Sequence, residues 1–181
     1  MEDNGTLKWR FDVSTFRLIG RDLITDRVTA LFELVKNCYD ANATEVTVKF
    51  DTVGLDKQNS AITISDDGFG MSFADIRDKW MVIGTSNKRS NPYTPLPFHR
   101  KCVGEKGIGR FAVDKLGDKV NIITKQEGEN DWLNVEIDWE SYYNNSNNQQ
   151  LSLFTDIENH YEFYPAEDKT EHGTMLNITN I

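Results

Sequence analysis

The sequence predicts an α+β fold, a two-layer α/β sandwich in which helices pack on a sheet. Apolar residues follow helical spacing from Arg27 to Ala41, which predicts an early helix. A second helix is predicted over residues 108–116. Most later periodic segments alternate apolar and polar residues, as strands do. An early helix, a mid-chain helix and a strand-rich tail are typical of an α+β arrangement.

The first predicted helix has a clear start and a clear core side. Asp26 is suited to cap its N-terminus. One apolar stripe at i, i+3, i+4 and i+7 marks the core side and consists of Leu31, Leu34, Val35 and Cys38. Strands are predicted next at 45–50 and 61–65, where apolar and polar residues alternate. A capping-box pattern at Ser72 and Asp75 predicts a further short helix.

The second half of the chain begins with an irregular segment. Residues 84–105 have no helical or strand periodicity and contain three of the four prolines. Such a length in a compact domain is typical of a functional lid or of disorder. Gly117 is predicted to stop the second helix. Three strands are then predicted, the first two joined as a hairpin, at 119–125, 132–139 and 174–178.

Composition limits the classes of protein to which the chain can belong. Its 181 residues suffice for one domain. It has no apolar run of the length that spans a membrane, and its first residues lack the features of a secretory signal. The two cysteines form no metal or disulfide pattern, so we expect a cytoplasmic location. The net charge of −9 argues against the whole domain being a nucleic-acid binder.

The middle of the chain is nevertheless basic. Residues 77–125 contain eleven Lys or Arg and only four acidic residues. A basic segment in an acidic protein indicates a site for a polyanion such as a triphosphate. A solvated basic surface would give the same pattern, so charge alone leaves both interpretations open.

The first candidate motif lies on the early helix. Glu33, Asn37 and Asp40 are spaced i, i+4 and i+7, so they stack on one face. That pattern is typical of any exposed helix face. It also places an amide oxygen, a neutral ligand for Mg²⁺, one turn from a carboxylate that can polarise water.

Two further motifs contain glycines. Asp66 follows an alternating strand and precedes Gly68 and Gly70, where its carboxylate can accept a hydrogen bond from an exocyclic amine. The alternative is a simple Asp-Gly turn. Residues 104–112 are glycine-rich and open the second helix, where backbone N–H groups favour anions. Their GxxGxG order matches neither the dinucleotide motif nor a Walker A, and a purely structural turn is the alternative.

Taken in order, these motifs resemble the GHKL ATPase superfamily. The resemblance rests on ELVKNCYDA (33–41), DDGFGM (66–71), GEKGIGRFA (104–112) and HGT (172–174). The superfamily includes the gyrase B subunit, the large ATP-driven heat-shock chaperones, histidine-kinase catalytic domains, MutL and the MORC proteins. The resemblance implies the Bergerat fold, a helical layer over a mixed, mostly antiparallel sheet, with ATP held between helices and a lid.

The resemblance also implies a role for each matching residue. Glu33 corresponds to the general base that orients or deprotonates the attacking water. Asn37 corresponds to the protein ligand of Mg²⁺. Asp66 corresponds to the aspartate that binds the adenine amino group, and Thr174 to the threonine that supports this contact. The other implied nucleotide contacts are Gly68, Gly70 and Met71 at the base, and Lys88, Gly104, Lys106, Gly107, Ile108 and Gly109 at the phosphates.

Some neighbouring polar residues receive no ligand role. Asp40 is expected to brace its helix, and the motif fixes no role for Arg110. The three histidines, His99, His160 and His172, are expected to be incidental.

The expected organisation is an N-terminal arm at 1–25 and an ATP-binding domain at 26–181 with a lid at about 84–106. We expect this to be the N-terminal part of a longer protein, with unidentified downstream domains and clients. A homodimer formed through the arm is a further expectation, as in several relatives. No membrane partner is expected, and nucleic acid would be bound only by regions outside this sequence.

The resulting functional prediction is Mg²⁺-dependent ATP binding and hydrolysis that drives a conformational change in a larger protein. Turnover by the isolated domain is expected to be weak, because ATPase members usually receive a catalytic Lys or Arg from a following domain. Two alternatives stay open: a histidine-kinase catalytic domain, against which Glu33 argues, and an adenine-nucleotide sensor without hydrolysis.

Overall fold

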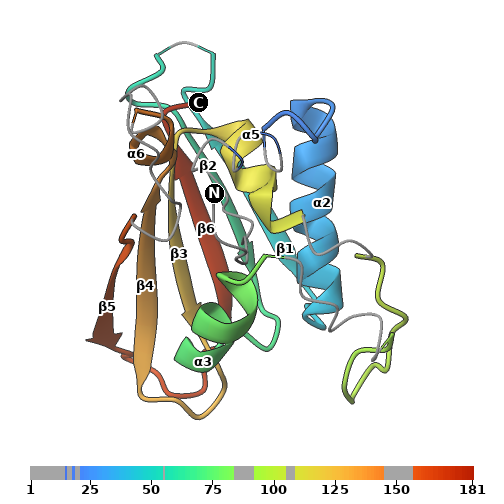
Figure 1. The fold of residues 1–181 in the computed structure, drawn as a ribbon. Coiled ribbons are helices and arrows are strands. Elements are labelled where there is room, and N and C mark those ends of the chain that lie inside the picture. The colour runs from blue at the N-terminus through green and yellow to red at the C-terminus, as the bar shows by residue number, and fades with distance from the viewer. Residues whose placement is uncertain are drawn as a thin grey trace, which may run out of the picture.

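The structure, a computed structural model, describes residues 21–54, 56–83, 92–104, 109–144 and 157–181, together with Thr15 and Leu18. Within them, six strands form one sheet, and helices α2 and α5 lie on one side of it (Figure 1). The predicted α+β sandwich is therefore confirmed. We expected a mixed, mostly antiparallel sheet, and every pairing between the described strands is antiparallel.

Helix α2 (Arg27–Asp40) begins at the predicted cap. The Oδ1 atom of Asp26 accepts a hydrogen bond from the backbone N–H of Thr29 at 2.8 Å, which satisfies one of the free donors at the helix start. Of the predicted core stripe, Leu34 and Cys38 are buried, whereas Leu31 and Val35 are only half-buried. Ala30, which was not predicted, is also buried.

The capping-box prediction is also confirmed. Helix α3 (Phe73–Asp75) continues as a π-helical turn, η1 (Ile76–Trp80). The Ser72 hydroxyl accepts from the backbone N–H of Asp75, whose carboxylate accepts from the N–H of Ser72. These reciprocal bonds start the helix where the sequence places it.

The mid-chain helix is divided into a 3₁₀ turn, η2 (Gly109–Phe111), and helix α5 (Ala112–Leu116). It ends at Gly117 as predicted, but not through a left-handed cap, because the φ of Gly117 is −157°. A Cβ atom on Gly117 would instead lie 2.5 Å from the carbonyl oxygen of Thr179. Close packing against the last strand therefore explains this glycine.

The sheet has the order β1-β2-β6-β3-β4-β5. Its strands are β1 (Val46–Asp51), β2 (Ala61–Asp66), β3 (Lys119–Lys125), β4 (Asp131–Asp138), β5 (His160–Pro165) and β6 (Gly173–Thr179). The last strand lies in the centre, where Thr174 of β6 pairs with Asp66 of β2 on one side and Thr124 of β3 on the other. This insertion brings the C-terminal motif beside the Asp66 motif.

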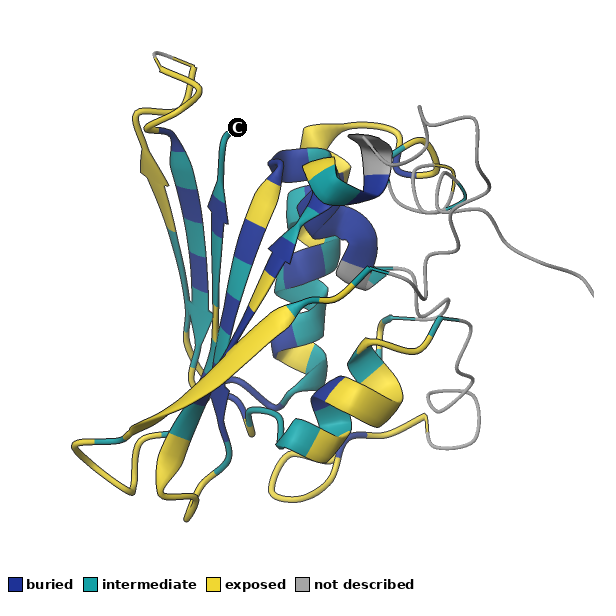
Figure 2. Cartoon of the chain, turned by 60° about the vertical axis from the view of Figure 1, so that its left-hand side comes forward, coloured by how far each residue is buried: buried dark blue, intermediate teal, exposed yellow. Residues whose placement is uncertain are grey.

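The two faces of the sheet differ in polarity. Buried apolar residues on β2, β3 and β4 alternate with more exposed ones (Figure 2). On the other face, polar side chains pair across strands, as where Asn121 Nδ2 donates to Asn134 Oδ1 at 3.3 Å. The alternation follows from the two-residue period of a strand with one face packed under helices.

Two elements were not predicted. Helix α6 (Trp139–Asn144) begins where we expected β4 to end, because Trp139 continues the apolar alternation of that strand. The carboxylate of Asp138 accepts from the backbone N–H of Glu140 at 3.0 Å and turns the chain into the helix. Strand β5 is aromatic-rich and exposed along its length, and its Tyr161 and Phe163 rings contact Phe73 of α3.

Most of the expected N-terminal arm, including residues 1–14, lies outside the described residues. Among the helices that the structure describes, none combines the length and the apolar character needed to cross a membrane.

Candidate functional site

The polar face of α2 meets the start of η2 at Gly109. A Cβ atom on Gly109 would lie 3.3 Å from Glu33 Oε2 and 3.6 Å from Asn37 Nδ2, so both side chains lie directly beside this glycine. The other carboxylate oxygen of Glu33, Oε1, accepts a hydrogen bond from Lys36 Nζ at 2.6 Å. The structure thus brings together Glu33, Asn37 and Gly109, and the Oε2 atom of Glu33 faces Gly109.

The second group forms around Asp66 at the end of β2. Its Oδ1 atom accepts from the backbone N–H of Gly68 at 2.9 Å. Burial raises the pKa of the Asp66 carboxyl above its ordinary value, although the Gly68 N–H and the adjacent Cys38 thiol favour the charged form. Burial and the Asp66 charge together raise the pKa of the Cys38 thiol. A carboxylate held in such surroundings gains from a ligand that donates to it.

The neighbouring Asp67 has a different environment. Its Oδ1 atom accepts from the backbone N–H groups of Thr44 at 2.7 Å and Glu45 at 2.8 Å, and Oδ2 accepts from the Thr44 hydroxyl. Burial opposes the charge, but these hydrogen bonds outweigh it and lower the pKa of Asp67. Asp67 therefore holds the turn before β1.

Close backbone contacts require the glycines of this group. A Cβ atom on Gly70, whose φ is +67°, would lie 2.0 Å from the carbonyl oxygen of Lys125. A Cβ atom on Gly173, whose φ is +132°, would lie 2.0 Å from that of Asp66. At Gly68, the nearest atom would be the carbonyl oxygen of Ala41 at 2.7 Å. Four segments distant in sequence thus meet where no side chain fits.

The Thr124 hydroxyl links the remaining residues of the group. It accepts from the backbone N–H of Met71 at 2.8 Å, donates to the carbonyl oxygen of Gly173 at 3.0 Å, and lies 3.0 Å from the Thr174 hydroxyl. Thr124 was missed from the sequence because a β-branched residue inside a strand carries no functional signal. The structure therefore brings together Asp66, Gly68, Gly70, Met71 and Thr174, as expected from their motifs.

Two further residues contribute to this group. We expected His172 to be incidental, but its Nδ1 atom lies 2.7 Å from the carbonyl oxygen of Gly68. The ammonium of buried Lys125 donates to the carbonyl oxygens of Lys169, at 2.9 Å, and Glu171. Both contacts fix the segment before β6 against the Asp66 turn.

The segment before the third motif is attached to the end of α2. The carboxylate of Asp40 accepts from the backbone N–H groups of Val103 at 2.8 Å and Gly104 at 3.0 Å. Arg100 Nη1 donates to the carbonyl oxygen of Ala43 at 2.7 Å. We expected Asp40 to brace its own helix, whereas these bonds position Gly104. The other expected phosphate contacts, Lys88, Lys106, Gly107 and Ile108, lie outside the described residues.

Helix α2 connects the two groups. Glu33 and Ala41 are eight residues apart, about 12 Å along a helix, and each contacts a glycine of a different motif. An extended ligand placed along this side of α2 would meet the Asp66 carboxylate at one end. At the other end it would meet a carboxylate, an amide and the backbone around Gly109. Such a set suits a molecule with an amine-bearing ring and an anionic tail that carries a divalent cation, because the carboxylate would repel the anion alone.

Comparison with known families agrees with this chemistry. Residues 25–174 match the family model described as "Histidine kinase-, DNA gyrase B-, and HSP90-like ATPase". The match includes the α2 motif, the Asp66 motif and Thr174.

Two relatives with different names contain a segment similar to this chain. "Chaperone protein HtpG" of Sulfurovum sp. (strain NBC37-1) is 26% identical over 179 residues, which cover 90% of this chain and 26% of that protein. "Putative type II restriction enzyme HgiDII" of Herpetosiphon aurantiacus is 27% identical over 128 residues, 71% of this chain and 19% of that protein. The chain thus spans about a quarter or less of these two relatives.

A solved structure shares the fold. The N-terminal domain of a DNA repair protein superposes with a TM-score of 0.55 and 18% identity, covering 92% of this chain and 39% of that one. At this identity the likeness concerns the fold alone.

Proposed function

The chain belongs to the histidine kinase-, DNA gyrase B- and HSP90-like ATPases, the GHKL superfamily, and from this premise we propose that it hydrolyses Mg²⁺-bound ATP to drive a conformational change in a larger protein. ATP binding is the property that the family implies. The observation that carries the hydrolytic part is the position of Glu33 and Asn37 side by side at Gly109.

In this proposal, Asp66 selects the base. Its carboxylate accepts from the exocyclic amine of adenine, while the Gly68 N–H holds the same side chain in place. Guanine presents a carbonyl at the equivalent ring position, which a carboxylate would repel. Thr174 and Met71, joined through Thr124, support this end of the proposed nucleotide site.

Glu33 acts as the general base. Water attacks the γ-phosphorus, its proton passes to Glu33, and the bond between that phosphorus and the β–γ bridging oxygen breaks. Lys36 holds Oε1 at 2.6 Å, so Oε2, on the Gly109 side, is the oxygen that would accept the proton. General-base catalysis by a positioned carboxylate contributes about 10²–10⁴-fold in rate.

Asn37 would hold the magnesium ion, which neutralises phosphate charge when bound. Among the described residues, no three His, Cys, Asp or Glu side chains gather as a metal site. One amide oxygen nevertheless fits Mg²⁺, because this ion takes most of its ligands from phosphates and water. The proposed phosphate contacts are Gly104, Gly109, Lys88, Lys106, Gly107 and Ile108.

The conformational part of the proposal rests on the relatives. Proteins named as a chaperone and as a putative restriction enzyme contain a segment similar to this chain within a much longer protein. A nucleotide-driven module would serve different downstream domains in each. We therefore also propose that residues 26–181 form such a module and that a downstream domain completes the active site.

The test compares the full-length protein, including the downstream domain proposed above, with its Glu33→Ala variant. Calorimetry is expected to show ATP·Mg²⁺ binding by both, with dissociation constants within about threefold, while phosphate release falls at least 10²-fold in the variant. Glu158→Ala, which removes an exposed carboxylate elsewhere, is expected to leave both unchanged. Equal turnover by wild type and Glu33→Ala would remove the hydrolytic proposal. Absence of ATP binding in the wild type would remove the nucleotide site itself.

A further inference from the structure

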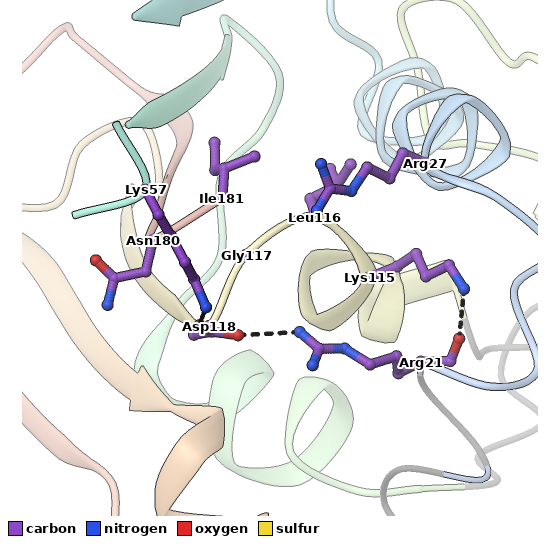
Figure 3. A pocket seen from close by; sticks show the side chains of 9 residues that line it. All are labelled: Arg21, Arg27, Lys57, Lys115, Leu116, Gly117, Asp118, Asn180 and Ile181. Atoms are coloured by element: carbon purple, nitrogen blue, oxygen red, sulfur yellow. Dashed lines mark hydrogen bonds and ion pairs between the residues drawn. The ribbon is translucent and has the colours of Figure 1, made fainter. Parts of the chain in front are cut away.

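A pocket of about 290 Å³ lies at the end of the sheet opposite the Asp66 group. The residue that opens α2, Arg27, borders it together with Lys115 of α5, Arg21, Lys57 and Asp118 (Figure 3). Strand β6 runs from Gly173, beside Asp66, to Thr179, beside the pocket, a distance of roughly 20 Å. The pocket is therefore this far from the Asp66 end of the proposed nucleotide site, while Arg27 lies six residues, about 9 Å along α2, from Glu33 at the other end.

The pocket lining contains four cationic side chains and one carboxylate. Asp118 neutralises two of the cations, through Arg21 Nη2 at 3.0 Å and Lys57 Nζ at 2.6 Å. Asp114, just outside the lining, also faces Arg21. The acids near the pocket are thus largely committed to Arg21 and Lys57.

Arg27 and Lys115 carry the remaining positive charge. Lys115 Nζ donates to a neutral acceptor, the carbonyl oxygen of Arg21, at 3.0 Å. Two of the three ammonium hydrogens of Lys115 can still be donated to a ligand. The side chain of Arg27 makes no hydrogen bond or ion pair with any residue in the described part of the chain. The nearby Asp26 carboxylate is bonded to Thr29 as the helix cap, and its hydrogen bonds to Thr29 together with the charge of Lys115 lower its pKa. The pocket lining therefore contains more positive than negative side chains.

The floor of the pocket is fixed by backbone contacts. The N–H of Asp118 donates to the carbonyl oxygen of Thr179 at 3.1 Å, and the N–H of Ile181 donates to the Ser60 hydroxyl at 2.9 Å. Gly117 allows this approach, because any side chain there would collide with Thr179. The cationic side chains thus surround a pocket whose backbone is held in place by these contacts.

We propose that this pocket binds a phosphate-bearing ligand, with Arg27 and Lys115 as the primary contacts. Its volume equals that of about ten water molecules in the liquid, which accommodates a phosphate group and part of an attached ester. The planar guanidinium of Arg27 can donate two parallel hydrogen bonds to a phosphate, and the ammonium of Lys115 can donate a further one. Lys57, whose side chain is 62% exposed, can turn from Asp118 toward the same anion.

The experiment titrates inorganic phosphate into the 181-residue chain while a non-hydrolysable ATP analogue with Mg²⁺ saturates the nucleotide site. Sodium chloride keeps the ionic strength constant. Calorimetry is expected to show saturable phosphate binding, with a dissociation constant on the order of 1 mM or tighter. The double variant Arg27→Gln/Lys115→Gln is expected to bind at least tenfold more weakly. Lys49→Gln/Arg77→Gln removes the same charge from exposed positions elsewhere and is expected to stay within twofold of wild type.

A second measurement needs no variant. In NMR spectra of the analogue-bound wild type, phosphate is expected to shift the amide resonances of residues 116–118 and leave those of Gly68 and Gly109 unchanged. The proposal fails if wild type shows no saturable binding, if both double variants lose affinity equally, or if the shifts cluster at Gly109. Binding of the ATP analogue, measured separately for each variant, distinguishes this failure from failure of the nucleotide site.

Discussion

The Nδ1 atom of His172 lies 2.7 Å from the carbonyl oxygen of Gly68, a contact that joins residues 104 positions apart. It fixes the turn after Asp66 against the segment that leads into β6. The Asp66 carboxylate accepts from the N–H of the same Gly68. The histidine therefore acts on the proposed adenine contact through the backbone of one glycine.

Removing this contact is expected to weaken nucleotide binding. Loss of one hydrogen bond of about 1 kcal/mol should lower ATP affinity roughly fivefold in His172→Ala. The turnover rate at saturating ATP should not change, because His172 is remote from Glu33. Calorimetry measures the ATP affinity, and phosphate release measures the turnover rate. The control is His160→Ala, because His160 lies on the exposed strand β5. An unchanged dissociation constant in His172→Ala would contradict the positioning role.

Asp66 and Asp67 are expected to respond in opposite directions to the same substitution. The pKa of Asp66 is raised in the folded protein, so ionisation of this carboxyl at neutral pH lowers the free energy of unfolding. The loss begins as the pH rises above the ordinary pKa of an aspartate. Asp66→Asn should therefore raise the melting temperature without nucleotide. It should also weaken ATP binding at least tenfold, because the amide turns a donor toward the adenine amine.

Asp67→Asn should instead lower the melting temperature. The pKa of Asp67 is lowered in the folded protein, so its charged form stabilises the fold above the ordinary pKa, and this contribution is lost as the pH falls. Thermal unfolding at pH 7 and at about pH 3, below the ordinary value of 3.8, measures both effects, and the deficit of Asp67→Asn should shrink at the lower pH. Shifts of the same sign in both variants at pH 7 would show that the two environments are assigned incorrectly.

Gly173→Ala is expected to be strongly destabilising. The φ of +132° is unfavourable for alanine, and the added methyl would lie 2.0 Å from the Asp66 carbonyl oxygen. We expect a loss of more than about 3 kcal/mol in the free energy of unfolding. Gly128→Ala is the matched control, because its φ of +84° is also positive but nothing lies within 4 Å. That variant should lose only about 1 kcal/mol, as measured by urea unfolding, and equal losses would exclude the close contact as the cause.

Asp40→Ala is expected to release the segment before the third motif. Loss of hydrogen bonds to a charged group, about 1.5–3 kcal/mol each, should speed hydrogen exchange at the Val103 and Gly104 amides at least tenfold. ATP affinity should fall with it, since Gly104 is a proposed phosphate contact. Asp51→Ala, an exposed acid at the end of β1, should change neither quantity. Unaltered exchange in Asp40→Ala would mean that other contacts hold this segment.

Local signals explain which elements could be predicted. The Asp26 cap, the Ser72–Asp75 capping box and the hairpin of β3 and β4 each depend on residues close together in sequence, and all are present. Helix α6 was missed because Trp139 suits both a strand end and a helix start. Its location was decided by the burial of Trp139 and Tyr142 in the core, which local propensity does not encode.

The sequence by itself determined the chemistry: a carboxylate and an amide one turn apart on a helix, an aspartate before paired glycines, and the order of the motifs. Tertiary structure alone decided how these groups meet. Insertion of β6 between β2 and β3 places Gly173 on the Asp66 backbone and Thr174 beside Thr124, and packing of η2 on α2 places Gly109 beside Glu33. These contacts depend on strand order and on close packing between distant segments, so Thr124, His172 and the basic pocket became visible only in the folded chain.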